Sequence, residues 1–215
     1  MELDCYKMIA LKKELFWIPA DLPIFEHKKE LVQLYVQDYQ NQKVAKAFGS
    51  QMFTHRVENY AVSKFKNDYE ESHKHLYDYI NTHLPYDNLV NVKIHNNIRQ
   101  GKAHVDFVFP EKNKELYANN TGNEPCGYRM VIAGDRQGHL FVDKTNADGS
   151  TERVYPTLPE TTDWYILNST SAYHGLDGVN PDRYILFCHA WINKQQHDEI
   201  IKRSLEKYSD YAIWS

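Results

Sequence analysis

Residues 104 to 106, the triplet His-Val-Asp, carry two side chains that can ligate a metal ion and that lie two positions apart. In an extended strand alternate residues point to the same face, so His104 and Asp106 can reach one ion if this stretch is a strand. The triplet has little weight alone, because 11 histidines and 29 acidic residues in 215 positions provide about 1.5 His-x-acid triplets by chance. A second one, at 197–199, is indeed present. Whether the triplet at 104–106 belongs to a metal site therefore depends on the residues further along the chain.

A third metal-ligating residue and a basic residue follow in a suitable order. His174 lies 68 residues after Asp106, between a predicted strand and a turn, and Arg183 follows nine residues later at the start of another predicted strand. Two imidazoles and one carboxylate bind Fe(II) on one face and leave the opposite positions open. A guanidinium binds a carboxylate through two parallel hydrogen bonds, which Lys cannot do. The set predicts an iron site of His104, Asp106 and His174 with an anion-binding Arg183.

Short alternating segments in the middle of the chain predict the strands that would position these residues. They cover 89–95, 103–109, 128–134, 139–143, 152–156, 163–167 and 183–192. Helical spacing of apolar residues predicts helix over most of the first 85 residues and again at 194–208. We therefore expect a mostly β fold with flanking helices, whose core is a double-stranded β-helix (a cupin-like jelly roll).

The order of these elements predicts a single domain over residues 1–215. Residues 1–88 would form a mainly helical N-terminal part, 89–193 the jelly-roll core and 194–215 a C-terminal helix. The polar segment 109–127 interrupts the strands and is long for a connection. Such segments are usually lids or binding loops, or else disordered, and both interpretations stay open here.

Composition excludes several classes of partner. The net charge is −4 and the pI about 6.2, which predicts no nucleic-acid partner. The longest apolar runs have about five residues, against the roughly 20 that a membrane span needs, so no membrane partner is expected. Three widely spaced cysteines and an N-terminus without an uninterrupted apolar run favour a cytoplasmic location.

Three stretches resemble the Fe(II)/2-oxoglutarate-dependent oxygenases, and among them the aspartyl/asparaginyl β-hydroxylase branch. GKAHVDF (101–107) resembles the strand that bears the first metal-binding His. YRMVIAG (128–134) resembles the following strand of that branch, in which an Arg helps to hold the co-substrate. Residues 164–193 resemble the segment in which the second metal-binding His follows a strand and an Arg begins the last strand.

The resemblance implies a dioxygenase that uses Fe(II), 2-oxoglutarate as co-substrate and O₂. It assigns the iron to His104, Asp106 and His174, and the distal carboxylate of 2-oxoglutarate to Arg183. Arg129 would hold a carboxylate of the co-substrate or the substrate, with a structural ion pair as the alternative.

Two departures from the branch bear on the substrate. Its hydroxylases of protein domains lack the carboxylate ligand, whereas Asp106 is present here, and the same residue disfavours a halogenase. Their Arg-x-His pair reads Arg129-Met130-Val131 in this chain. Both features favour hydroxylation of an amino acid or a similar polar small molecule. The alternatives are a hydroxylase of a protein or peptide residue, a non-catalytic cupin-like barrel that binds a metal or ligand, and an iron enzyme that uses O₂ without 2-oxoglutarate.

Other polar and aromatic residues have a weaker claim to the site. Asn91 and His95 are candidates for lining the pocket, and His189 is expected in the core or behind the ligands. Residues i and i+2 of a helix point about 200° apart, so the triplet at 197–199 is expected on a solvated helix face. We assign Trp164, Trp191 and Tyr173 to the core and His73 and His75 to the surface.

Overall fold

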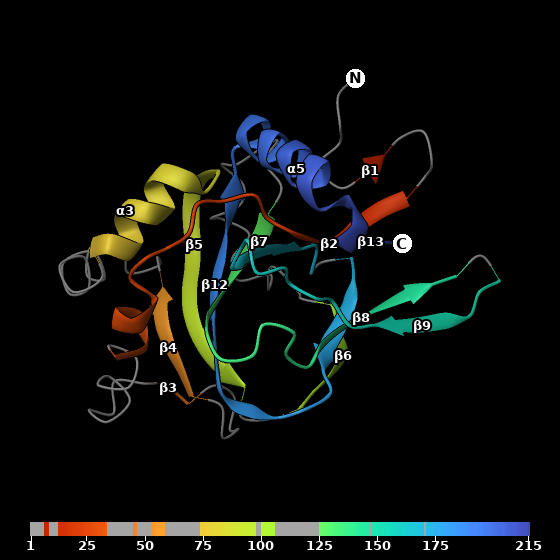
Figure 1. Ribbon diagram of the computed structural model, residues 1–215, viewed down its shortest axis with the longest axis horizontal. Helices are drawn as coiled ribbons and strands as arrows, with labels where there is room; N and C mark the ends of the chain where they lie inside the picture. Colours follow the sequence, from red (N-terminus) through yellow and green to blue (C-terminus); the bar gives the residue numbers. More distant parts are fainter. Residues whose placement is uncertain are drawn as a thin grey trace, which may run out of the picture.

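Two antiparallel β-sheets lie against each other and form the body of the protein (Figure 1). The computed structural model describes residues 7–8, 13–33, 45–46, 53–58, 74–97, 100–105, 125–146, 148–169 and 171–215. The larger sheet has the order β1 (Lys7–Met8), β2 (Lys13–Pro19), β10 (Trp164–Leu167), β7 (Pro125–Ala133), β12 (Asn180–Ile192), β5 (Tyr86–Asn97), β4 (Phe53–Glu58) and β3 (Ala45–Lys46), and β13 (Ile213–Trp214) pairs with β2. The smaller sheet has the order β6 (Gly101–His104), β11 (Tyr173–Leu176), β8 (Leu140–Thr145) and β9 (Thr151–Val154).

The pairing of strands β5 to β12 is that of a jelly roll. The first strand of this series pairs with the last, β5 with β12, and the pairs β6–β11, β7–β10 and β8–β9 are nested inside it. The β5–β12 and β7–β10 pairs lie in the larger sheet and the other two in the smaller one. A long hairpin folded over into two sheets has this nesting, so the predicted double-stranded β-helix is confirmed.

The predicted strands of the core all overlap observed ones. The prediction for 103–109 is met by β6 only as far as His104, and residues 106–109 lie outside the described part. The segment 109–127 also lies outside it, except that residues 125–127 begin β7.

Residues 13–19 correct the prediction of a mainly helical N-terminal part. They form strand β2, which pairs with β10 and β13 and buries Leu15, Trp17 and Ile18. The run Leu-Phe-Trp-Ile contains two aromatic residues and one β-branched residue and has only four residues, which suits a strand buried on both faces. Strands β1, β3 and β4 also lie in this part, and α3 (Lys74–His83) is the long helix described there.

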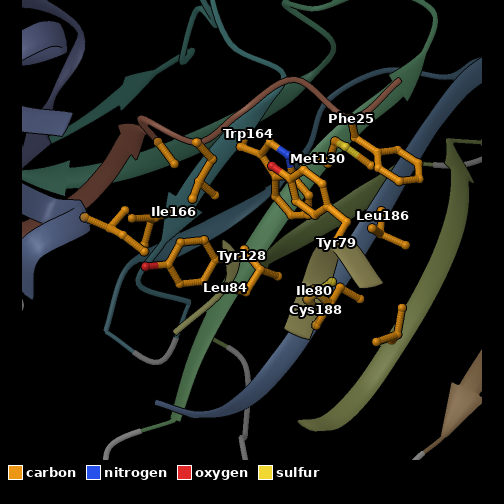
Figure 2. Packing of buried hydrophobic residues seen from close by; sticks show 14 of the residues in the cluster. Phe25, Tyr79, Ile80, Leu84, Tyr128, Met130, Trp164, Ile166, Leu186 and Cys188 are labelled. Atoms are coloured by element: carbon orange, nitrogen blue, oxygen red, sulfur yellow. The ribbon is translucent and has the colours of Figure 1, made fainter. Parts of the chain in front are cut away.

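Two helices cover the outer face of the larger sheet, away from the smaller one. Helix α3 buries Leu76, Tyr79 and Ile80, and the ring of Tyr79 stacks on Trp164 of β10 at 5.5 Å between centroids (Figure 2). Helix α5 (Lys194–Tyr208) is capped at its N-terminus by Asn193, whose side chain accepts a hydrogen bond from the backbone amide of Gln196. Its predicted apolar face is confirmed by the buried Ile200, Ile201 and Tyr208 and the partly buried Leu205. No helix among the described residues has the length and apolar character of a membrane span.

Alternation along the central strands separates two cores. On β12, Leu186 and Cys188 pack beneath the helices, whereas Ile185 and Phe187 pack between the sheets. On β7, Met130 faces the helices and Val131 faces the smaller sheet. Residues that alternate in step with Ile185 on β12, or with Val131 on β7, therefore point into the space between the sheets.

Candidate functional site

Two of the predicted metal ligands face each other on adjacent strands of the smaller sheet. His174 on β11 is the register partner of His104 on β6, and their ring centroids lie 4.7 Å apart. His174 is buried, whereas His104 ends its strand and is exposed. His174 lies two residues before Leu176 on β11, so its side chain points to the same face as that of Leu176, which packs between the sheets. The fold thus brings together on one sheet two imidazoles that are far apart in the sequence.

Both imidazoles are oriented in the same way by their own backbone. Nδ1 of His174 lies 2.9 Å from the carbonyl oxygen of Ala172, and Nδ1 of His104 lies 2.8 Å from that of Lys102. A carbonyl oxygen only accepts, so in each ring Nδ1 carries the proton and donates it. That tautomer places the basic lone pair on Nε2, the nitrogen with which such a histidine binds a metal ion.

The proposed carboxylate ligand is not among the described residues. The structure describes residues 100–105 and then resumes at residue 125, so it does not include Asp106. The role of Asp106 as the third ligand, beside His104 and His174, therefore remains a prediction.

Arg183 lies near the start of β12, two residues before Ile185 and on the same face. It is only 3% exposed. Its Nε donates to the carbonyl oxygen of Asp135 at 2.8 Å, which fixes the plane of the guanidinium. Within the described residues this is its one hydrogen bond, so both Nη groups remain for an anion. This is the fork that binds a carboxylate.

The loop between β7 and β8 is shaped around Arg183. Gly134 and Gly138 both have positive φ, +85° and +56°. A Cβ on Gly134 would lie 2.7 Å from the Cα of Arg183, and a Cβ on Gly138 would lie 2.5 Å from its Cζ and Nε. Only glycine permits this backbone and this close approach together. Both glycines lie in the stretch AGDRQG (133–138), and nothing in that stretch signals that it holds Arg183.

A partly buried ion-pair cluster ties the same loop to Asp163, the residue before β10. Nη1 of Arg136 lies 2.6 Å from Oδ1 of Asp163, and its Nη2 donates to the carbonyl oxygens of Pro159 and Thr162. Lys28 binds the other carboxylate oxygen of Asp163 at 2.6 Å. Arg136 lies between the two glycines in the sequence, so its clamp fixes the loop that touches Arg183.

Arg129, on β7, is the second buried cation on this inner face. It is 3% exposed and lies two residues before Val131, so it points to the same face of β7. Its Cζ lies 4.5 Å from the ring centroid of Phe187 on β12. The ring of His95, on β5, lies 4.4 Å from the same phenyl ring. The backbones of Asn91 and His189 pair with each other across β5 and β12, and their side chains are not among those that the structure describes.

The two sheets carry different polar groups on the faces that they turn toward each other. The smaller sheet contributes two imidazoles with their Nε2 lone pairs, and the larger sheet contributes the guanidinium groups of Arg129 and Arg183. A buried cation is costly without an anion or a shell of hydrogen bonds. The imidazole pair therefore suits a metal ion, and the Nη groups of Arg183 suit a carboxylate.

Two predicted positions are wrong. His197, expected on a solvated face of α5, is fully buried, and its Nδ1 lies 2.8 Å from the hydroxyl oxygen of Tyr128. Tyr173, expected in the core, is 57% exposed, because it has the opposite parity to His174 on β11. Trp164 is buried as predicted.

Comparison with known proteins gives a distant likeness of fold. No family model and no curated protein sequence matches the chain. A prolyl-4-hydroxylase from Pseudomonas putida is 9% identical, with a TM-score of 0.45 over 83% of this chain and 92% of that chain. A Trichoplax adhaerens prolyl hydroxylase, solved with a peptide fragment of hypoxia inducible factor, is 12% identical, with a TM-score of 0.42 over 79% and 80%. The non-heme alpha ketoglutarate dependent epimerase SnoN of nogalamycin biosynthesis is 12% identical, with a TM-score of 0.46 over 82% and 76%.

Proposed function

We propose that this protein is an Fe(II)- and 2-oxoglutarate-dependent dioxygenase that hydroxylates an amino acid or a similar polar small molecule. The observation that carries the proposal is the pairing of His104 with His174 in the smaller sheet of the jelly roll. The backbone carbonyl groups set both rings in the tautomer that binds a metal through Nε2.

The donor set fits ferrous iron. His104 and His174 supply two neutral nitrogen ligands, and Asp106 is the proposed third ligand, because an extended chain turns residues i and i+2 to the same side. Two histidines and one carboxylate are the facial set of non-haem iron oxygenases. When bound there, the iron supplies the oxidative chemistry, taking up 2-oxoglutarate and O₂ to oxidise a C–H bond.

The arginines supply binding and orientation. Arg183 is proposed to bind the distal carboxylate of 2-oxoglutarate with its Nη pair, while the loop at 134–138 and the Nε hydrogen bond hold the guanidinium still. Arg129 is proposed to bind a further carboxylate, of the co-substrate or of the amino-acid substrate, with Phe187 beneath it. Apolar residues of the core between the sheets, such as Val142 and Ile185, would exclude water and so strengthen both proposed ion pairs.

The finer assignment, to an enzyme like the aspartyl/asparaginyl β-hydroxylases, belongs to the same proposal. It is supported by the burial of Arg129 on the inner face of β7, in the stretch YRMVIAG that resembles that branch. The presence of Asp106 and the replacement of the branch histidine by Val131 favour the small-molecule members.

Turnover of 2-oxoglutarate tests the proposal directly. The purified chain with Fe(II), ascorbate, 2-oxoglutarate and a panel of amino acids should release succinate, faster with the true substrate. Arg183→Ala should raise the KM for 2-oxoglutarate by about tenfold or more, the value of a charge-assisted hydrogen-bond pair.

Arg153→Ala is the matched control. Arg153 binds Asp143 and Asp177 and lies over the ring of Phe141. Phe141 points to the opposite face of β8 from Leu140 and Val142, which face inward, so Arg153 lies on the outer face of the smaller sheet. Its loss should leave the KM unchanged. Iron binding without any succinate release would contradict the proposal and favour a non-catalytic metal-binding barrel, and an equal effect of both arginine variants would remove Arg183 from the site.

A further inference from the structure

A second group of metal-ligating side chains lies on the other side of the larger sheet. It consists of His27, Glu30 and His75, whose donor atoms all lie within 4.8 Å of one another. We propose that these three residues bind a divalent transition-metal ion of the zinc type, at a site separate from the His104–His174 pair. This proposal does not depend on the oxygenase function.

The three side chains meet from two segments that are distant in the sequence. His27 and Glu30 are three residues apart, which places them on one side of a helical turn. Nδ1 of His27 lies 3.2 Å from Oε2 of Glu30. His75, in the first turn of α3, stacks on His27, with ring centroids 3.8 Å apart and planes within 3° of parallel.

The backbone that carries the ligands is held by buried neighbours. Phe25, two residues before His27, packs edge-on against Tyr79, one turn after His75, at 5.3 Å between centroids. The hydroxyl of Tyr79 also donates to the carbonyl oxygen of Pro23 at 2.5 Å (both rings are visible in Figure 2). Leu31 and Leu76, each adjacent to a ligand, are buried in the same core. The two segments are therefore fixed to each other before any ion binds.

The donor set and its exposure suit zinc. Two imidazoles and a carboxylate are a common zinc ligand set, with solvent or a substrate completing a tetrahedron. Zinc–ligand bonds of 2.0–2.1 Å place ligand atoms about 3.4 Å apart, so the donors need to approach by no more than about 1.4 Å. The side chains of His27 and Glu30 are 44% and 46% exposed and His75 is exposed, which leaves room for that adjustment and for entry of the ion.

Such an ion would join two parts of the chain. The site links Glu30 to His75, 45 residues further on, so a bound metal closes a long loop. Cross-links of this kind stabilise a fold chiefly by restricting its unfolded state. The expected role is a structural clip between the 21–33 segment and α3.

Zinc titration in two backgrounds tests the site. Because the proposed iron site would also bind zinc, the test uses the full chain carrying His104→Ala and His174→Ala, with calorimetry and thermal unfolding as readouts. This variant should still bind one equivalent of Zn²⁺ and melt at a higher temperature with the ion than with EDTA. Adding His75→Ala should weaken zinc binding by about tenfold or more and remove the shift in melting temperature.

His83→Ala, at the other end of α3, is the matched control and should retain zinc binding. Melting in EDTA shows whether His75→Ala folds, and Glu30→Gln, which keeps the size of the side chain, provides a second variant that should also weaken binding. Absence of Zn²⁺ binding in the His104→Ala/His174→Ala chain, or an affinity that His75→Ala and Glu30→Gln leave unchanged, would overturn the proposal.

Discussion

Gly138 leaves the space that the guanidinium of Arg183 occupies. A Cβ at Gly138 would lie 2.5 Å from both Cζ and Nε of Arg183, on a backbone with φ of +56°. The position of the arginine in the proposed co-substrate site is thus set by a residue of a different strand connection.

Replacing Gly138 by Ala should therefore act on co-substrate binding. The added methyl group displaces the guanidinium, and we expect the KM for 2-oxoglutarate to rise by about tenfold, as for the loss of a charged hydrogen bond. Steady-state kinetics of succinate release measures this. Gly149→Ala is the control, because Gly149 also has positive φ, +83°, but nothing lies within 4 Å of its added Cβ. It should cost about 1 kcal/mol of stability and leave the KM unchanged; equal KM values for the two variants would contradict the prediction.

The carboxylate of Asp163 should contribute far more to the free energy of unfolding than that of Asp21 does. Each accepts two cations, but Asp163 is almost buried between Lys28 and Arg136, whereas Asp21 lies among the half-exposed Arg203 and Lys207. Asp163→Asn leaves two partly buried cations without their anion, and we expect a loss of about 3 kcal/mol in the free energy of unfolding. Asp21→Asn should cost about 1 kcal/mol or less. Urea denaturation of both variants compares them, and similar losses would show that burial does not decide the value of these pairs.

The core of the fold could be predicted because its signals are local. Strands such as 128–134 and 183–192 alternate clearly, and α5 shows its apolar face through Ile200, Ile201 and Tyr208. Strand β2 could not be found in the same way. Four consecutive apolar residues have no period, and only the pairing of Lys13–Pro19 with β10, about 150 residues later, makes them a strand.

The sequence singles out candidate residues for the site by their types and order, but it gives no sign of the contacts that support them. His174 and Arg183 are marked by their order in the chain, and the structure places both on inner faces of the jelly roll. The contacts of Gly138 and Arg136 with that region depend on how a loop folds back. The prediction for His197 was wrong because it rested on the spacing of the triplet at 197–199 along a helix. The hydrogen bond between His197 and the hydroxyl group of Tyr128 joins residues 69 positions apart and has no local signal.

The burial of His197 predicts how stability should change in acid. Burial lowers the pKa of His197 to about 3, with a smaller contribution from nearby Lys194. In the unfolded chain a histidine has a pKa of about 6.5, so between these values only the unfolded state binds this proton. Acid therefore favours unfolding: the contribution to stability is fully present above pH 6.5 and falls by at most about 1.4 kcal/mol per pH unit as the pH drops toward 3.

His197→Gln isolates this effect, because an amide does not titrate and its oxygen can still accept the hydrogen bond of the Tyr128 hydroxyl. Between pH 7 and pH 5 the wild-type protein should lose about 2 kcal/mol more in its free energy of unfolding than the variant does. Urea denaturation at the two pH values gives this difference. The prediction is wrong if His197→Gln loses as much stability as the wild-type protein over this range.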